Sequence, residues 1–490
     1  MSLLRALLLI SVVAGSLLAQ SDTLAETLLS EAGNSPSLER NLRTLCDEIG
    51  GRLAGTSAYD RAAEWALEAF RAAGVDKAHA EQFEMPVSWR EGDTQIEVLA
   101  PTKFRVSALS TAWSPATRRR GVEAEVLDAG RGSPGRIVRL GSKARGKILL
   151  VRLAEASAFY DLGVEQRNAI VAMREAEQVG AAAVLYASTR PLRLLYRHIH
   201  SITGELDPVP SALITREDAL RIARFLDDGA EVKINVRLPN RIGGPFKQSN
   251  VVAEIRGSEQ PDEIVIFGAH LDSWDLGSGC LDNGCNVSIV IETARAIVAT
   301  GLRPRRTLRF VLFGGEEQGV HGSRSYVRAH RDELDKIVAV MVHDMGLGEI
   351  RGYSLGGRYD MEEGVLRAVA PLGGRADEPS FEAFYGTDHY DFFLEGIPTL
   401  VAMQDTTEYV APYHSPADTY DKISLYALRR RAQVAAVVAF NLANDPKRLG
   451  PRYNREQIEG LLESTRMKDQ LEFLNLWDEW ASGERGRAAE

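Results

Sequence analysis

The sequence contains little cysteine and, beyond its first residues, no long apolar segment. Three cysteines in 490 residues exclude a small scaffold stapled by disulfides, so the fold must rest on a hydrophobic core. Basic residues are in deficit, because 58 Lys and Arg against 68 Asp and Glu give a net charge of −10. This balance argues against nucleic acid or an anionic membrane as the main partner. Only nine histidines are present, so their positions are informative about function.

The size and composition indicate a large globular protein. At roughly 150 residues per domain, the chain corresponds to about three units, or to one large core with insertions. Apolar residues make up 44% and charged residues 26% of the chain, values that are typical of globular proteins. A chain of this size can bury a large core without covalent staples.

The N-terminal segment has the pattern of a secretory signal peptide. Arg5 supplies a positive charge, residues 6–13 form a short and mostly apolar run, and small residues up to Ala19 offer cleavage sites. The run is shorter than the ~20 residues needed to span a bilayer. We therefore expect residues 1–19 to be a signal peptide, and the mature protein to be extracellular or periplasmic without a membrane span. The alternative is an uncleaved N-terminal anchor.

Composition divides the rest of the chain into four segments. Residues 20–115 are predicted to be the N-terminal part of the main domain, and residues 247–445 its larger part. Between them, residues 116–246 have the pattern of a self-contained insert of short strands and two helices, ending at a Gly-Gly-Pro boundary. Residues 446–490 are predicted to be a charged, helical tail, which could mediate a homodimer or pack back on its own chain.

Residues 247–445 alternate between strand-like and helix-like patterns. A helix is predicted at 285–299, and strands at 251–255, 263–267, 307–313, 337–342 and 399–403. Strands this apolar are typical of a sheet that is buried on both faces. The sequence therefore predicts an α/β fold in which a mixed, mostly parallel sheet carries helices on both faces.

Histidine and acidic residues follow the predicted strands of this region. The runs FGAHLDSWD, LDNGCN, FGGEEQG, MVHDMG and PYHSPAD supply His270, Asp272, Asp282, Glu316, Glu317, Asp344 and His414. Ligand sites of open α/β sheets lie outside the carboxyl ends of the strands. We therefore expect these side chains to converge, although they are far apart in the sequence.

Two histidines and three carboxylates suffice for a site with two metal ions. Zinc binds His nitrogen and carboxylate oxygen, and two zinc ions about 3.5–4 Å apart can share a bridging carboxylate and a water. Glu316 then remains as a general base, and Asp272 could accept the second imidazole proton of His270. Each motif alone has an ordinary explanation, such as a turn at Asp282 or a solvated helix start at Glu316. Two adjacent like charges after an apolar strand, however, indicate a compensating cation.

These runs resemble the metal-binding blocks of the M28 family of zinc exopeptidases. GAHLDSWDLGSGCLDNG, GGEEQG, GTDHYDFF and HSPADT occur in the order of that family, and the insert is similar to a protease-associated (PA) domain. The resemblance implies that Glu316 is the catalytic base and that Asp272 supports His270. It also implies two Zn²⁺ per chain: one held by His270 and Asp344, the other by Glu317 and His414, with Asp282 as the bridge.

The same resemblance implies a function. We expect a secreted di-zinc metallo-exopeptidase that hydrolyses dipeptides or short peptides with a free N-terminus, with Thr387, Asp388 and Tyr413 lining the substrate pocket. Alternatives are an aminopeptidase that acts on longer peptides, a carboxypeptidase, or a glutaminyl cyclase, which shares the fold but generally lacks the insert. A non-catalytic receptor-like ectodomain is a further alternative, and the intact set of candidate ligands argues against it.

The cysteines and the remaining histidines leave alternatives open. Cys280 and Cys285 flank Asp282 and could form a disulfide in an oxidising compartment, or pack as small apolar side chains. Binding of zinc by a thiolate is a third alternative, which would require one of the other ligands to be displaced. Cys46 is then expected to be unpaired and buried. A polar surface pair is a more ordinary role than metal binding for His198 and His200. Three other histidines are expected to line the site rather than to bind metal: His321, His343 and His389.

Overall fold

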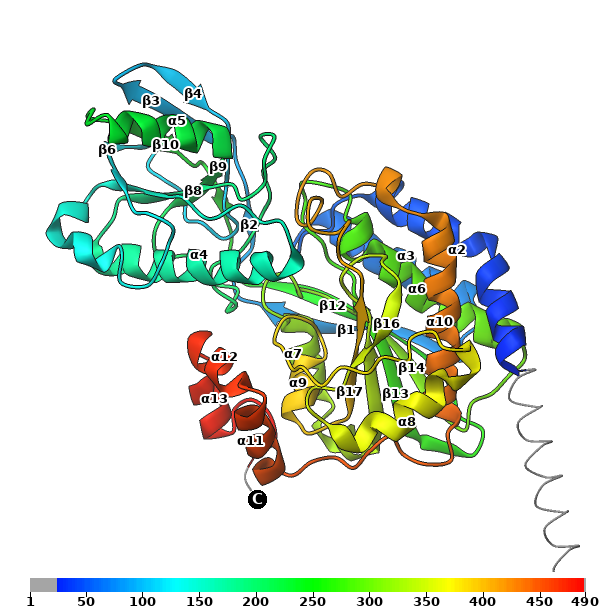
Figure 1. Ribbon diagram of the computed structural model, residues 1–490. Helices are drawn as coiled ribbons and strands as arrows, with labels where there is room; N and C mark the ends of the chain where they lie inside the picture. Colours follow the sequence, from blue (N-terminus) through cyan, green and yellow to red (C-terminus); the bar gives the residue numbers. More distant parts are fainter. Residues whose placement is uncertain (1–23, 489–490) are drawn as a thin grey trace, which may run out of the picture.

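The computed structural model describes residues 24–488 (Figure 1), so the predicted signal peptide lies outside the described residues. Within residues 24–488, two large sheets of seven and eight strands are joined by a two-stranded ribbon of β2 (Trp89–Arg90) and β11 (Arg241–Ile242). The chain passes through this ribbon on its way to the second sheet and again on its return. In this part of the chain no helix is both long enough and apolar enough to cross a membrane.

The seven-stranded sheet carries the predicted alternation of strands and helices. Strands β14, β13, β15 and β17 run parallel, and the other pairs are antiparallel, so the sheet is mixed. The strand order is β1 (Lys77–Met85), β12 (Phe246–Ile255), β14 (Arg306–Phe313), β13 (Gln260–His270), β15 (Ile337–Val342), β17 (Thr399–Gln404) and β16 (Ile350–Ser354).

Helices cover both faces of this sheet. Successive side chains of a strand point to opposite faces, so each strand packs against two helical layers. Val265 and Phe267 of β13 belong to one helical layer, and Ile264 and Ile266 belong to the other. The first layer contains α2 (Pro36–Arg43), α3 (Ser57–Ala72), α6 (Cys285–Ala299), α8 (Glu362–Val369) and α10 (Leu425–Asn444). The second contains α7 (His321–Ala329) and α9 (Tyr390–Leu394). The predicted fold class is therefore confirmed.

The eight-stranded sheet has a two-sided core of its own. Tyr186 packs with α4 (Phe159–Val179), whereas its neighbour Leu185 packs with α5 (Arg216–Asp227) on the opposite face. Figure 1 shows these two helices on either side of the sheet. The strand order is β4 (Phe104–Val106), β3 (Gln95–Ala100), β10 (Lys233–Arg237), β6 (Val122–Asp128), β7 (Ile148–Val151), β8 (Ala183–Ala187), β9 (Ser211–Ile214) and β5 (Ala108–Ser110).

This second sheet begins earlier in the chain than the composition suggested. Strands β3, β4 and β5 precede the expected boundary at residue 116. They belong to the second sheet because β3 pairs with β10 and β5 pairs with β9, both more than a hundred residues downstream. Pairing between distant segments leaves no mark in local composition, so the true start of this unit could not be predicted from composition.

The C-terminal tail packs back on its own chain. It forms three short helices: α11 (Arg455–Ser464), α12 (Met467–Phe473) and α13 (Trp477–Ser482). Leu462 and Trp480 of these helices are buried in one cluster with Phe393 of α9. Arg485 pairs with Asp391 of α9 through two hydrogen bonds of 2.8 and 2.9 Å, and both side chains are buried. A homodimer stays a prediction.

Candidate metal centre

Three neighbouring parallel strands bring the acidic residues to one edge of the seven-stranded sheet. His270 is the last residue of β13, Glu316 and Glu317 follow β14 after two glycines, and Asp344 lies two residues beyond β15. Because β13 lies between β14 and β15, the carboxyl ends of all three strands meet at this edge. The short π-helical turn η3 (Cys280–Gly284) adds Asp282.

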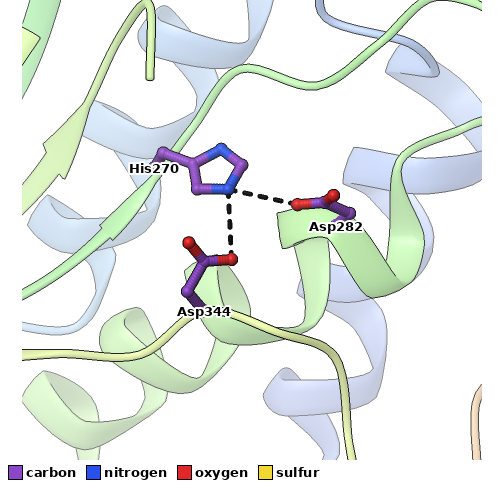
Figure 2. A group of neighbouring side chains, drawn as sticks. All are labelled: His270, Asp282 and Asp344. Atoms are coloured by element: carbon purple, nitrogen blue, oxygen red, sulfur yellow. Dashed lines mark ion pairs between the residues drawn. The ribbon is translucent and has the colours of Figure 1, made fainter. Parts of the chain in front are cut away.

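The first group of candidate ligands is His270, Asp282 and Asp344 (Figure 2). The Nε2 atom of His270 lies 3.2 Å from Oδ1 of Asp282 and 3.4 Å from Oδ1 of Asp344. All three side chains are buried. Figure 2 shows the two carboxylates converging on the same imidazole nitrogen.

The second group shares Asp282 with the first. It consists of Asp282, Glu317 and His414, which are also buried. Nε2 of His414 lies 3.3 Å from Oδ2 of Asp282 and 3.0 Å from Oε2 of Glu317. Asp282 thus presents a different carboxylate oxygen to each histidine. The structure therefore brings together all five predicted ligands, in two groups joined by the residue that was expected to bridge them.

Hydrogen bonds at the far side of each imidazole determine which nitrogen faces the carboxylates. Nδ1 of His270 donates to the backbone carbonyl of Asp272 at 3.0 Å, and Nδ1 of His414 donates to the carbonyl of Arg197 at 3.0 Å. A carbonyl only accepts, so each Nδ1 carries the hydrogen and Nε2 of the neutral ring has a lone pair. A lone pair facing carboxylates calls for a positive charge between them, either a proton or a metal ion.

The pKa values of these residues also favour a positive charge at the site. Burial lowers the pKa of His414, but Glu317 and Asp282 outweigh it and raise the pKa to about 9. Burial raises the pKa of Glu317 to about 7, and Oε1 of Glu317 is buried without a hydrogen-bond partner. Burial also raises the pKa of Asp282, but its two imidazole contacts outweigh burial and hold it well below its usual range. These residues therefore fit a bound cation.

Glu316 lies beside the ligands but belongs to neither group. Burial raises its pKa well above the ordinary value. The nearby carboxylates of Asp344, Glu317 and Asp388 also raise this pKa, whereas His270 lowers it. Glu316 is therefore a carboxyl group that readily accepts a proton at this position.

Asp272 contributes in a different way from the one expected. Its carboxylate accepts hydrogen bonds from the backbone N–H groups of Glu316 and Glu317, both at 3.2 Å. The closest approach of that carboxylate to Nδ1 of His270 is 3.8 Å. The His270 proton is instead accepted by the Asp272 backbone carbonyl, which lies nearer because the chain turns directly after β13. The carboxylate of Asp272 therefore orients the Glu316–Glu317 turn.

Several residues that orient the candidate ligands were missed from the sequence. Asp418 accepts hydrogen bonds from the backbone N–H groups of Cys280, Leu281 and Asp282, at 3.0, 2.7 and 3.1 Å. Asp418 lies in the HSPADT run, so its motif was visible although its role was not. The buried Arg52 donates to the backbone carbonyls of Leu271, Ser278 and Gly279 beside β13 and η3, and to that of Gly50 in its own loop. No local pattern marked it.

The Asp344 loop is fixed by polar side chains from three elements. Asn286 of α6 and Gln404 of β17 both donate to the Asp344 carbonyl, at 3.1 and 2.9 Å. Arg431 of α10 donates to Asn286 at 3.0 Å and to the carbonyl of Gly346. These contacts hold the backbone on which Asp344 stands, so the ligand is oriented before any metal binds.

The predicted substrate-pocket residues lie around this centre. The Tyr413 ring stacks on the His414 ring, with their centroids 3.6 Å apart. Thr387 and Asp388 are buried just before α9. Burial raises the pKa of Asp388 to about 8. Asp272 and Asp344 also raise this pKa, whereas His270 lowers it.

A disulfide between Cys280 and Cys285, one of the alternatives left open for these cysteines, is not formed. Cys280 forms a disulfide with Cys46, which lies in the π-helical turn η1 (Thr44–Ile49) and was expected to be unpaired. Cys285 is free and buried, and its thiol donates to the carbonyl of Leu281 at 3.3 Å. Cys285 is the first residue of α6, and the partner of Cys280 comes instead from the turn η1, which precedes α3 in the chain.

The interpretation of His198 and His200 as a surface pair is also wrong. His200 is buried, and its Nδ1 lies 2.7 Å from Oδ2 of Asp207. The His198 ring lies against His414 with centroids 4.7 Å apart. Neither belongs to a ligand group, nor do the other three histidines of the region: His321, His343 and His389.

Comparison with known proteins identifies the family. The model of "Peptidase family M28" matches residues 250–439, which include every candidate ligand. Carboxypeptidase Q of Mus musculus is 32% identical over 414 residues, covering 83% of this chain and 86% of the mouse protein. The chain belongs to peptidase family M28. It is thus a metallopeptidase of a zinc exopeptidase family.

Solved structures agree with the M28 assignment. A peptidase M28 precursor from Shewanella amazonensis SB2B superposes with a TM-score of 0.79 at 28% identity, covering 89% of this chain and 99% of that one. A zinc aminopeptidase from Bacillus subtilis shares the fold, with a TM-score of 0.65 at 20% identity over 88% of this chain and 98% of that one. The likeness to the Shewanella peptidase therefore extends over both sheets.

Proposed function

We propose that this M28 peptidase is an exported di-zinc exopeptidase that hydrolyses dipeptides or short peptides with a free N-terminus. His270 and Asp344 would hold one zinc ion, Glu317 and His414 the other, and Asp282 would bridge them. The observation that carries the proposal is the placement of Asp282, whose two oxygens face two different imidazoles. A single carboxylate shared in this way is what a pair of metal ions about 3.5–4 Å apart requires.

The chemistry divides between the metal ions and the protein. Two bound zinc ions would supply a Lewis acid for the scissile carbonyl and a water of lowered pKa. Glu316 would take the proton from the attacking water and pass it to the leaving amine. Its raised pKa, caused first by burial, supports this role, because a carboxyl group of higher proton affinity than usual takes up a proton more readily. Asp272 keeps the Glu316 backbone in place.

The preference for a free N-terminus is supported by Asp388. This buried carboxyl group has a pKa of about 8 because burial and its acidic neighbours disfavour its charge. The ammonium group of a substrate would compensate that charge, whereas a blocked N-terminus could not. Thr387, whose hydroxyl is buried without a hydrogen-bond partner, would line the same side of the pocket, and Tyr413 would line the side of His414.

Two alternatives remain distinct from this proposal. An aminopeptidase on longer peptides would use the same metals and the same base, so only the length of the substrate separates the two. A non-catalytic receptor-like ectodomain would not need Glu316 or a complete ligand set. We also interpret the eight-stranded unit as an inserted PA domain and residues 1–19 as an export signal, on the sequence pattern.

The test is hydrolysis of a peptide panel by protein of known metal content. Dipeptides with free and with acetylated N-termini are compared with the matching tripeptides and pentapeptides. We expect cleavage of free dipeptides, loss of activity with a chelator, and its return with zinc. Equal cleavage of acetylated substrates would refute the requirement for a free N-terminus. Faster cleavage of pentapeptides than of dipeptides would favour the aminopeptidase, and no hydrolysis by the zinc-loaded protein would favour the receptor-like alternative.

A further inference from the structure

A segment of the eight-stranded unit holds one of the candidate ligands. The backbone N–H of Arg197 donates to the carbonyl of His414 at 3.0 Å, and Nδ1 of His414 donates back to the carbonyl of Arg197 at 3.0 Å. The ring of the next residue, His198, packs edge-on against the His414 ring. Arg197 therefore determines which His414 nitrogen faces Asp282 and Glu317.

The two histidines of the centre differ in this respect. His270 is held by the carbonyl of Asp272, which lies in its own loop. His414 depends on a carbonyl more than two hundred residues away in the sequence. The orientation of His414 is therefore only as precise as the placement of the eight-stranded unit against the seven-stranded sheet.

The guanidinium group of Arg197 fixes that placement. Its side chain is 1% exposed and lies 2.7 Å from Oε2 of Glu91 and 3.0 Å from Oδ1 of Asp275. It also donates to the carbonyl of Ser110 at 3.1 Å. Glu91 follows β2 of the connecting ribbon, Asp275 follows Asp272 in the metal-binding loop, and Ser110 ends β5 of the second sheet. One buried cation thus joins both units directly beside His414.

We propose that Arg197 is a positioning residue of the metal centre. Its guanidinium group anchors the backbone whose carbonyl orients His414, so the eight-stranded unit controls metal binding by His414 and Glu317. The inference rests on the proposed function, because it takes His414 as a zinc ligand. On this account the eight-stranded unit orients one of the candidate ligands of the metal centre.

The test is a calorimetric titration of zinc into the metal-free full chain, with R197M compared with the wild type. Replacing a residue that orients a metal ligand commonly costs 10–100-fold in affinity. We expect R197M to weaken one of the two zinc-binding steps by about 10–100-fold and to leave the other unchanged. H414A identifies the affected step, since it removes the same one.

Two further variants make the result decisive. Arg193 lies in the same segment, but its side chain is 50% exposed and pairs with Asp218, so R193M should bind zinc like the wild type. If R197M does not fold, R197K decides the question, because lysine keeps the charge but carries all its donors on one nitrogen, which cannot replace the three guanidinium nitrogens that face Ser110, Glu91 and Asp275. Unchanged affinities in a folded R197M or R197K, or equal losses in both steps, would overturn the role of Arg197. A wild type with a single zinc step would overturn the proposed function as well.

Discussion

At the scale of single residues, the centre depends on charges that the protein leaves uncompensated. Glu316 and Glu317 are adjacent, Glu317 is buried and Glu316 half-buried, and burial raises the pKa of both. Asp272 holds the backbone of both, so the turn cannot relax by moving one carboxylate away. Such an arrangement is costly unless a cation compensates for it. The two glutamates therefore have different roles, Glu317 as a candidate ligand and Glu316 as the candidate base.

The first prediction separates these roles. Glu316→Gln preserves shape and removes the proton acceptor, so we expect a loss of about 10²–10⁴-fold in kcat with unchanged zinc content. Steady-state kinetics and metal analysis of the same preparation measure both quantities. Substantial turnover by the variant would contradict the assignment of Glu316 as the base, and loss of zinc would show that Glu316 is a ligand.

The sequence revealed ligands more readily than it revealed the residues that orient them. The five candidate ligands follow strands in recognisable runs, and the structure brings them together, although their binding of zinc stays a prediction. Arg197 acts through its own backbone and through partners from three distant segments. Contacts of this kind depend on tertiary structure alone, and no spacing in the sequence encodes them.

At the scale of elements, the turn η3 that carries Asp282 is fastened from two sides. Asp418 accepts three of its backbone N–H groups, and the disulfide to Cys46 ties it to η1. Cys280 lies near Asp282 in the sequence, but its disulfide partner could not be predicted, because Cys46 lies 234 residues away. Only the packing of the N-terminal helices against α6 brings the two together.

The second prediction concerns this crosslink. Cys46→Ser should lower the free energy of unfolding by about 2–5 kcal/mol, the usual effect of removing a native disulfide that closes a long loop. Chemical denaturation under non-reducing conditions measures the change. The matched control is Cys285→Ser, which removes a buried free thiol and should cost about 1 kcal/mol. Peptide mapping that finds Cys46 as a free thiol would contradict the pairing.

The third prediction concerns His330, which joins α7 to β1 and to the following turn. Nε2 of His330 lies 2.8 Å from Glu81, and its Nδ1 pairs with Glu333. Burial lowers its pKa, but these carboxylates outweigh burial and raise the pKa to about 9. The pKa of this imidazole is higher in the folded protein than in the unfolded chain, where it is about 6.5, so protonation stabilises the fold. The stabilisation is fully present at pH values below about 6.5. This stabilisation is lost as the pH rises through 9.

Urea unfolding at pH 6.5 and at pH 9.5 measures this loss. The wild type should lose about 1–2 kcal/mol more over this range than His330→Gln. His79→Gln is the control, because His79 also contacts Glu81 at 2.8 Å but lies outside the pair with Glu333. An identical pH dependence of the wild type and His330→Gln would show that His330 is not the group responsible.

At the scale of the whole molecule, the centre is assembled from parts that composition could separate only approximately. Five strands of the seven-stranded sheet (β12, β13, β14, β15 and β17) were predictable because each contains a continuous apolar run, whereas β16 and the bounds of β1 were not predicted. The extent of the second sheet and the packing of the tail were not, since both depend on pairing between distant segments. The eight-stranded unit contacts His414, and the tail contacts α9 beside Thr387 and Asp388.

The most direct test of the account is the zinc content of Asp282→Ala after gel filtration, measured beside the wild type. Asp282 is the only residue shared by the two ligand groups found within residues 24–488. If it bridges two zinc ions, the wild type should retain two per chain and the variant should lose both together, with its circular dichroism spectrum unchanged. A variant that still binds one zinc ion with wild-type affinity would contradict the bridged centre.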